Sequence, residues 1–156
     1  MIETIILAGI MGCLFMDIWQ RMLFRLSGIA PSNMAMIGRW AYRALGKGMI
    51  FQPDIDMVDT YRNEVPFGWF FHYVIGVVYA VIYAFLIEVH LLSDSLIDGL
   101  FFGALSVIVP WFFFLPATGK GVLAQQTPTP LKICVLAFIT HCIFGIGIAF
   151  GFQIAS

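Results

Sequence analysis

Two histidines occupy matching positions in two apolar stretches of the sequence. His72 and His141 each lie four residues after a small residue, four before a glycine and eight before an alanine, within residues 68–80 and 137–149. A step of four residues keeps such a row on one face of a helix. Because ionisable groups inside a membrane are costly and usually face the protein interior, the two rows predict a functional site at the imidazoles.

Other polar side chains extend this candidate site. Asp17 interrupts the first apolar stretch, and Tyr79 continues the face of His72 at helical spacing. A carboxylate between imidazoles can hold a proton, fix the tautomer of an imidazole or bind a cation. We therefore expect a site for a small ligand or an ion that contains Asp17, His72, His141 and Tyr79. We assign no catalytic residue, because no nucleophile, phosphate-loop or other enzyme motif is present, so an enzyme is not favoured.

The histidines have two further interpretations. His72 and His141 could ligate a haem, with the following glycines allowing close approach of the macrocycle, or could join Asp17 in holding a divalent metal. Alternatively, each histidine only makes a hydrogen bond between helices while Asp17 pairs with Arg21, four residues on. The chain would then be a structural or assembly subunit of a larger membrane complex.

The composition is that of a membrane protein. Of the 156 residues, 61% are hydrophobic and 11% are charged, whereas a soluble domain carries about 25% charged residues. There is too little charge to cover a water-facing surface, so the predicted surrounding is a lipid bilayer. The basic residues are also few and adjacent to the membrane, which argues against nucleic acid as a partner.

Four apolar stretches are long enough to cross a bilayer, which takes about 20 residues. The predicted spans cover about residues 2–26, 65–88, 95–118 and 130–153. Between the first two, residues 33–45 carry apolar side chains on one face with Arg39 and Arg43 on another, which predicts an interfacial amphipathic helix. We therefore expect an all-α fold, in which residues 1–156 form a single transmembrane domain: a four-helix bundle with a short amphipathic helix in its first loop.

The distribution of Lys and Arg predicts the orientation of this bundle. All eight lie either from Arg21 to Arg62 or at Lys120 and Lys132. Basic segments stay on the cytoplasmic side of a membrane. Both termini should therefore face outward.

This orientation gives the polar residues a common depth. With a helical rise of about 1.5 Å per residue and a hydrocarbon core about 30 Å thick, Asp17 lies about 9 Å from the cytoplasmic boundary. On the same scale His72 lies about 10 Å and His141 about 13 Å inside the core. Three groups on three helices therefore fall within one slab of the cytoplasmic half.

Small residues predict where the helices approach one another closely. Glycines four residues apart let two helix backbones meet, and the positions that we expect to pack in this way are Gly68, Gly76, Gly99, Gly103 and Gly145. Packing inside the bundle is one interpretation of this pattern, and the face of a homodimer is the other.

Six short motifs are spread along nearly the whole chain. They are Met16-Asp17-x-Trp19, Gly38-Arg39-Trp40, Gly68-Trp69-x-x-His72-Tyr73-x-Ile75-Gly76, Pro116-Ala117-x-Gly119-x-Gly121, Thr127-Pro128-x-Pro130 and Thr140-His141-x-x-Phe144-Gly145. With these motifs the chain resembles a family of small bacterial four-span membrane proteins grouped as a domain of unknown function. The resemblance implies a bacterial inner-membrane protein and adds Arg39 to the polar set, but it brings no activity.

Overall fold

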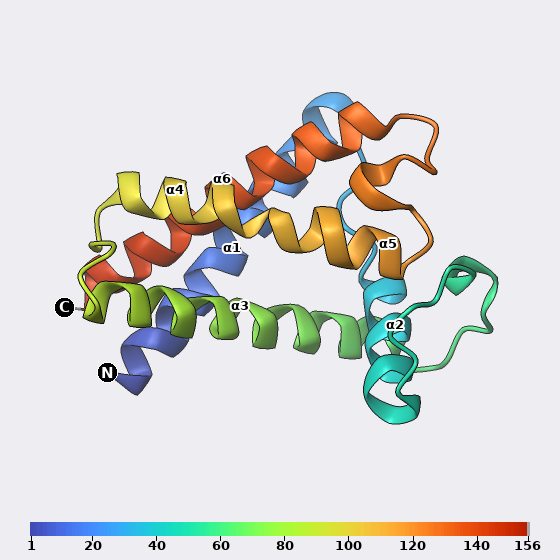
Figure 1. The fold of residues 1–156 in the computed structure, drawn as a ribbon, viewed down its shortest axis with the longest axis horizontal. Coiled ribbons are helices and arrows are strands. Elements are labelled where there is room, and N and C mark those ends of the chain that lie inside the picture. The colour runs from blue at the N-terminus through green and yellow to red at the C-terminus, as the bar shows by residue number, and fades with distance from the viewer. Residues whose placement is uncertain (156) are drawn as a thin grey trace. The chain divides into compact units, whose positions relative to one another are not determined.

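The structure, a computed structural model, describes residues 1–155, and these residues form helices and loops without a β-strand (Figure 1). The α-helices are α1 (Ile2–Ser27), α2 (Met34–Lys47), α3 (Glu64–Glu88), α4 (Leu96–Ser106), α5 (Leu115–Ala117) and α6 (Pro130–Ala155). Short helical turns are η1 (Ile55–Met57), η2 (Pro110–Phe114) and η3 (Val122–Ala124). The predicted all-α fold is confirmed.

Four helical segments are long and apolar enough to cross a membrane. They are Ile2–Ser27, Glu64–Glu88, Leu96–Ala117 and Pro130–Ala155. Large apolar side chains such as Phe70, Phe85 and Phe101 stay exposed along them. A water-soluble protein rarely leaves so much contiguous apolar surface uncovered, so this surface suits a lipid environment.

Local sequence explains where α1 ends and where α2 begins and ends. Gly28 ends α1 in a left-handed conformation, φ 68°, with its N–H donated to the carbonyl of Phe24. The Asn33 side chain accepts the N–H of Met36 and so caps the start of α2. Helix α2 runs to Lys47, beyond the predicted end at residue 45, because the left-handed residue that stops it is Gly48.

The third apolar segment is not one uniform helix. Between α4 and α5, residues Pro110–Phe114 form a wide π-helical turn, and Leu115 donates its N–H to the carbonyl of Pro110. Proline lacks an N–H, and its ring clashes with the preceding turn of an α-helix. Pro110 thus accounts for this local change of helix type.

Contacts divide the chain into two compact units. Unit 1 contains Met1–Ser32, Tyr73–Ser106 and the chain from Phe138 onward, and unit 2 contains Asn33–His72 and Val107–Ala137. The single transmembrane domain expected for residues 1–156 stays a prediction.

In unit 1, small residues bring helices into backbone contact. A Cβ at Gly145 of α6 would collide with the carbonyl oxygen of Gly99 on α4, and one at Gly103 would collide with that of His141. Gly76 of α3 faces the thiol of Cys13 on α1 in the same way. Around these contacts lies a core of buried residues: Ala8, Cys13, Met16, Ala80, Tyr83, Phe102, Phe144, Ile148 and Ala149.

Unit 2 is built around the Trp40 indole of α2. Phe71, Phe113 and Phe114 meet this ring edge-on, with centroids 6.0, 6.1 and 5.2 Å away, and its Nε1–H donates to the carbonyl of Ile50 at 2.9 Å. Edge-to-face contacts of this kind favour a fixed ring packing.

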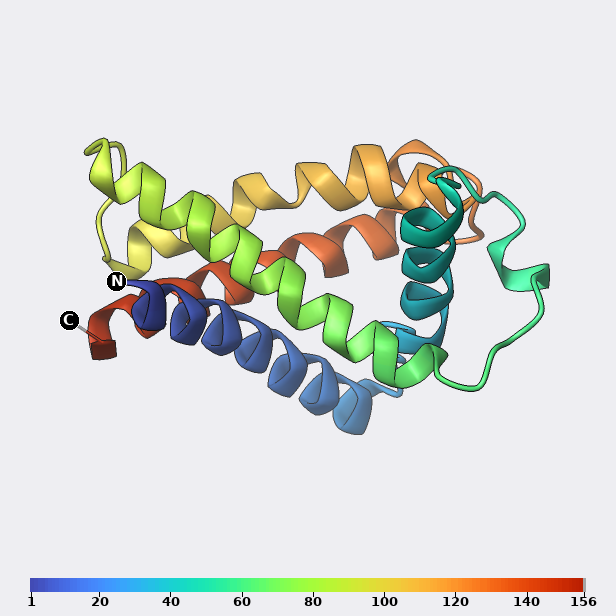
Figure 2. The ribbon, with the colours of Figure 1, turned by 90° about the horizontal axis from the view of Figure 1, so that it is seen from below.

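Helix α2 lies across the first turns of α3 (Figure 2). A Cβ at Gly38 would collide with the carbonyl of Glu64, and one at Gly68 would collide with that of Met34. Only glycine allows this approach of two backbones. On the same helix, Leu45 is 71% exposed. One face of α2 therefore packs on protein, and another face has an exposed apolar side chain.

Candidate functional site

Asp17 is buried within α1, in unit 1. Only 8% of the Asp17 surface is exposed. The Oδ2 atom of its carboxyl group accepts a hydrogen bond of 3.0 Å from the Tyr73 hydroxyl of α3. Cys13, one helical turn earlier, is buried beside Gly76. A phenol that donates to a carboxylate stabilises the charged form of the acid through a charge-assisted bond. The arrangement therefore places a carboxyl group with a phenol donor inside an apolar helix packing.

His141 lies on α6, also in unit 1, and is held by Ser106 of α4. The Ser106 hydroxyl lies 2.7 Å from His141 Nδ1 and donates to the carbonyl of Gly103, also at 2.7 Å. The hydroxyl thus lies between a ring nitrogen and a backbone carbonyl, and this contact orients the imidazole within the packing of α4 and α6.

Tyr79 lies in the aromatic layer beside His141. Its ring meets Phe102 and Phe144 edge-on, with centroids 6.2 and 5.5 Å away. The His141 ring lies 6.0 Å from the same Phe144. Tyr79 and His141 therefore share a neighbour, and the Tyr79 ring contributes packing to the core of unit 1.

His72 belongs to unit 2, near the start of α3. Its imidazole lies edge-on to the indole of Trp69, three residues earlier, with ring centroids 5.9 Å apart. Thus Asp17, Tyr79 and His141 belong to one unit, whereas His72 and Arg39 belong to the other.

Arg39 joins α2 to the start of α3. Its Nε and Nη2 donate to the two carboxylate oxygens of Glu64 at 2.9 and 3.1 Å. Its Nη1 donates to the carbonyls of Ile55 and Val58 at 3.0 and 3.1 Å. The hydrogen bond to Glu64 raises the pKa of the guanidinium above its usual value. A buried, bidentate pair with extra backbone acceptors has the geometry of a structural clamp, and a ligand contact at Arg39 stays a prediction.

Sequence reasoning missed three of these partners. The sequence pointed to Tyr73 only through its position directly after His72 in one of the motifs. Ser106 and Glu64 gave none, because serine is common in apolar helices and Glu64 lies just before the predicted span of residues 65–88, among other acidic residues.

A metal centre was the other chemistry suggested by the sequence. Within residues 1–155, no three or more side chains from His, Cys, Asp and Glu are grouped so that they could hold a metal ion. The arrangement of His141 with Ser106 is nevertheless of the kind that orients a ligating imidazole, since ligating histidines donate their other N–H to a nearby acceptor.

Comparison with known proteins gives the chain a family. The model of a family described as "Protein of unknown function (DUF2938)" matches residues 6–155. The chain belongs to this family. No curated protein and no solved structure matched it. DUF2938 brings no activity with it, so the function of this member has to be argued from its own residues.

Proposed function

We propose that this chain is an integral membrane protein that binds a small cation, a proton or an alkali-metal ion, at the Asp17 carboxylate. The observation that carries the proposal is the burial of Asp17 within a helix of spanning length, with the Tyr73 hydroxyl fixed on one carboxylate oxygen. A carboxylate inside a membrane is expensive, and such residues mark ion pathways and proton relays. An asparagine would fill the same space at lower cost.

In this proposal the site lies in the cytoplasmic half of a bacterial inner membrane, with both termini outside. Support comes from the charge pattern, because the basic residues of unit 1 are Arg21 and Arg25, in the last turns of α1. Basic residues favour the cytoplasmic side. Asp17 lies one helical turn before Arg21 and so close to this basic end of α1. The cation would therefore bind, or be transported, from the cytoplasmic side.

The experiment is a cation-dependent thermal melt of the purified protein in nanodiscs of neutral lipid. Wild type, Asp17→Asn and Glu3→Gln are compared in sodium, potassium or choline chloride at one ionic strength, and over a range of pH. Glu3 is an exposed carboxylate on the same helix and serves as the control. At a cation concentration about ten times its Kd, the melting temperature of wild type should rise by about 3–6 °C.

The Asp17→Asn variant should lose this response and Glu3→Gln should keep it. A variant with Arg21→Gln should also respond, because it retains the carboxylate. If wild type and Asp17→Asn respond alike to every cation and to pH, the proposal is wrong. If Asp17→Asn and His141→Ala change only thermal stability, and the protein co-purifies with a larger complex, it is a structural subunit instead.

A second candidate is a membrane redox protein that holds a haem with His141 as an axial ligand. The hydrogen bond between His141 and Ser106 favours it, because a hydrogen bond at one ring nitrogen orients a ligating imidazole. An absorption spectrum with elemental analysis of the purified protein tests it. A haem band or stoichiometric metal that His141→Ala removes would support this candidate, and a protein without either would end it.

A further inference from the structure

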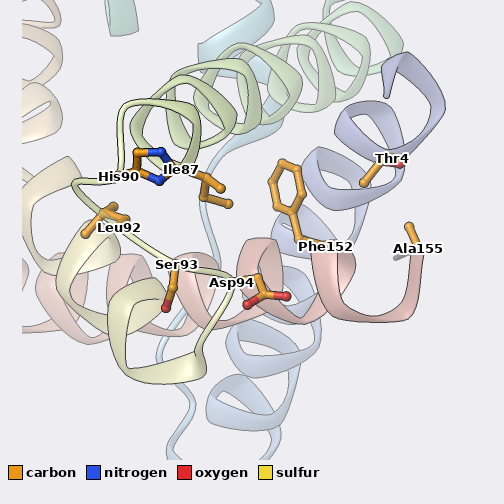
Figure 3. A pocket seen from close by; sticks show the side chains of 8 residues that line it. All are labelled: Thr4, Ile87, His90, Leu92, Ser93, Asp94, Phe152 and Ala155. Carbon is orange, nitrogen blue, oxygen red and sulfur yellow. The ribbon is translucent and has the colours of Figure 1, made fainter.

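One end of unit 1 carries a wide-open surface cavity of about 560 Å³ (Figure 3). It lies where α3 ends, α4 begins and the last turns of α6 pass, and it is separate from Asp17 in the sequence and in its lining residues. Its volume is within the range of about 300–1,000 Å³ that small-molecule sites occupy.

The lining of this cavity has an apolar and a polar part. Ile87, Leu92 and Phe152 provide apolar surface, and His90 and Asp94 provide an imidazole and a carboxylate. In Figure 3, Phe152 reaches in from α6, whereas His90 and Asp94 come from the loop between α3 and α4. An apolar body with one polar head would match such a lining.

Three hydrogen bonds hold the polar wall in place. The Tyr83 hydroxyl donates to the carbonyl of Ser93 at 2.7 Å, and the Asp98 carboxylate accepts the N–H of Ser93 at 2.8 Å. The side-chain amide of Gln153 donates to the carbonyl of Asp94 at 2.8 Å. These bonds attach the loop to α3, α4 and α6. Because the loop is already ordered before a ligand binds, binding costs less conformational entropy.

His90 occupies a backbone position that glycine normally fills. Beyond the end of α3, His90 donates its N–H to the carbonyl of Ile87, and Leu91 donates to that of Leu86. This is the Schellman pattern, in which the left-handed residue is usually glycine, yet here it is a histidine with φ 58°. A residue with a Cβ adopts this conformation at a cost that glycine avoids. Position 90 thus carries an imidazole that lines the cavity, although glycine would fit the backbone conformation better.

Carboxylates outnumber basic groups near the cavity. The side chains Glu3, Glu88, Asp94 and Asp98 lie within four residues of its lining in sequence, and the N-terminal amine of Met1 is the positive group near them. The nearest basic residue along α1 is Arg21, about 26 Å of helix away from Thr4. Charges at that separation are screened in physiological salt, so the four nearby carboxylates outweigh the single amine and favour a cation at the cavity.

We propose that this cavity binds a small organic cation, an ammonium group on an apolar or aromatic body. The Asp94 carboxylate would accept the ammonium, the His90 imidazole would accept a further N–H, and Phe152 with Ile87 and Leu92 would cover the body. This proposal is independent of the cation site at Asp17.

The test is a titration of the purified full chain in nanodiscs with phenethylammonium chloride, followed by calorimetry or ligand-observed NMR. The neutral 2-phenylethanol serves as the matched probe, and empty nanodiscs correct for partition into lipid. Wild type should bind the amine saturably and the alcohol at least about tenfold more weakly, because the alcohol lacks the charge.

Three variants locate the binding. Asp94→Asn should weaken amine binding by about tenfold or more. His90→Gly should weaken it by about threefold or more while the melting temperature stays equal or rises, since glycine relieves the backbone. Glu88→Gln removes a carboxylate of the same end that does not line the cavity, and should change binding less than about twofold.

Several outcomes would overturn the proposal. They are an absence of saturable amine binding to wild type, equal binding of the alcohol, equal losses in Asp94→Asn and Glu88→Gln, or full binding by His90→Gly. Equal binding of the alcohol would indicate an apolar cavity filled by lipid chains. Equal losses at the two carboxylates would indicate general attraction of cations to this end.

Discussion

The hydrogen bond between Tyr73 and Asp17 is the contact on which the proposed function depends. It joins a carboxylate of α1 to a phenol of α3 inside the core of unit 1. Hydrogen bonds to a charged group are worth about 1.5–3 kcal/mol, more than neutral ones. The bond therefore fixes the position of the carboxylate and offsets part of the cost of burying it.

Replacing Tyr73 by Phe should lower the free energy of unfolding by about 1.5–3 kcal/mol, because the carboxylate loses its phenolic donor. Chemical denaturation in detergent, followed by circular dichroism, measures this change. The control is Tyr79→Phe, which keeps the ring contacts with Phe102 and Phe144 and should be nearly neutral. In the Asp17→Asn background the cost of Tyr73→Phe should shrink; an undiminished cost would show that the two side chains do not interact.

At the scale of elements, two close helix contacts determine the fold of the two units. Glycine lets α4 meet α6 in unit 1 and lets α2 cross α3 in unit 2. The second contact aligns Arg39 with Glu64 across 25 residues of sequence. The amphipathic helix is thus fixed on α3 by a buried ion pair as well as by the packing of Trp40.

Replacing Arg39 by Lys should lower the free energy of unfolding by about 2–4 kcal/mol, because one ammonium cannot replace the bidentate pair. The exposed Arg62, changed to Lys, provides the control and should have little effect. Since the folded pKa of Arg39 is raised, its stabilisation is fully present below the ordinary pKa of an arginine and is lost only as the pH rises through the raised folded pKa. The measured cost should therefore be the same at pH 6 and pH 8; a strong dependence on pH in this window would contradict the assignment.

Adding one methyl group at Gly145 should separate α4 from α6. Gly145→Ala places a Cβ against the carbonyl of Gly99, and overpacking of this kind costs about 1–3 kcal/mol. The same substitution at Gly46, within α2, meets no atom within 4 Å and should stabilise the protein by about 0.5–1 kcal/mol. Thermal melts of the two variants should move in opposite directions, and a shift of equal sign would refute the packing argument.

The spans were predictable from the sequence because length and hydropathy alone define them, and caps such as Asn33 and Gly28 fix helix ends locally. Asp17 and His141 were also visible, since a polar residue in an apolar segment carries its own signal. Their partners were not. Tyr73 and Ser106 depend on how each helix is rotated about its axis, and Glu64 pairs with a residue in another helix. Such pairings arise from packing and leave no local pattern.

At the scale of the whole molecule, Lys and Arg are absent from the loop between α3 and α4, which borders the cavity. They lie instead at the end of α1 and in the first and third loops, and this asymmetry predicts opposite sides of a membrane. A single orientation would therefore serve both proposals: a cation site reached from the cytoplasm through α1, and an amine cavity that opens outward.

This orientation can be measured with single-cysteine variants in which Cys13, Cys134 and Cys142 are first replaced. Leu91→Cys should react with a membrane-impermeant maleimide in intact cells, because residue 91 lies in the loop predicted to face outward. Gln125→Cys should react only after the membrane is permeabilised. The reverse pattern of labelling would place both termini in the cytoplasm and contradict the predicted orientation.

The most direct test of the central claim, that Asp17 binds a small cation, is infrared difference spectroscopy of the protein in nanodiscs. When choline is exchanged for sodium, potassium or acid, wild type should show a change in a carboxyl stretching band. Asp17→Asn should abolish this band, and Glu3→Gln should retain it. A wild-type spectrum without a cation-dependent carboxyl band, or one that Asp17→Asn reproduces, would contradict the account.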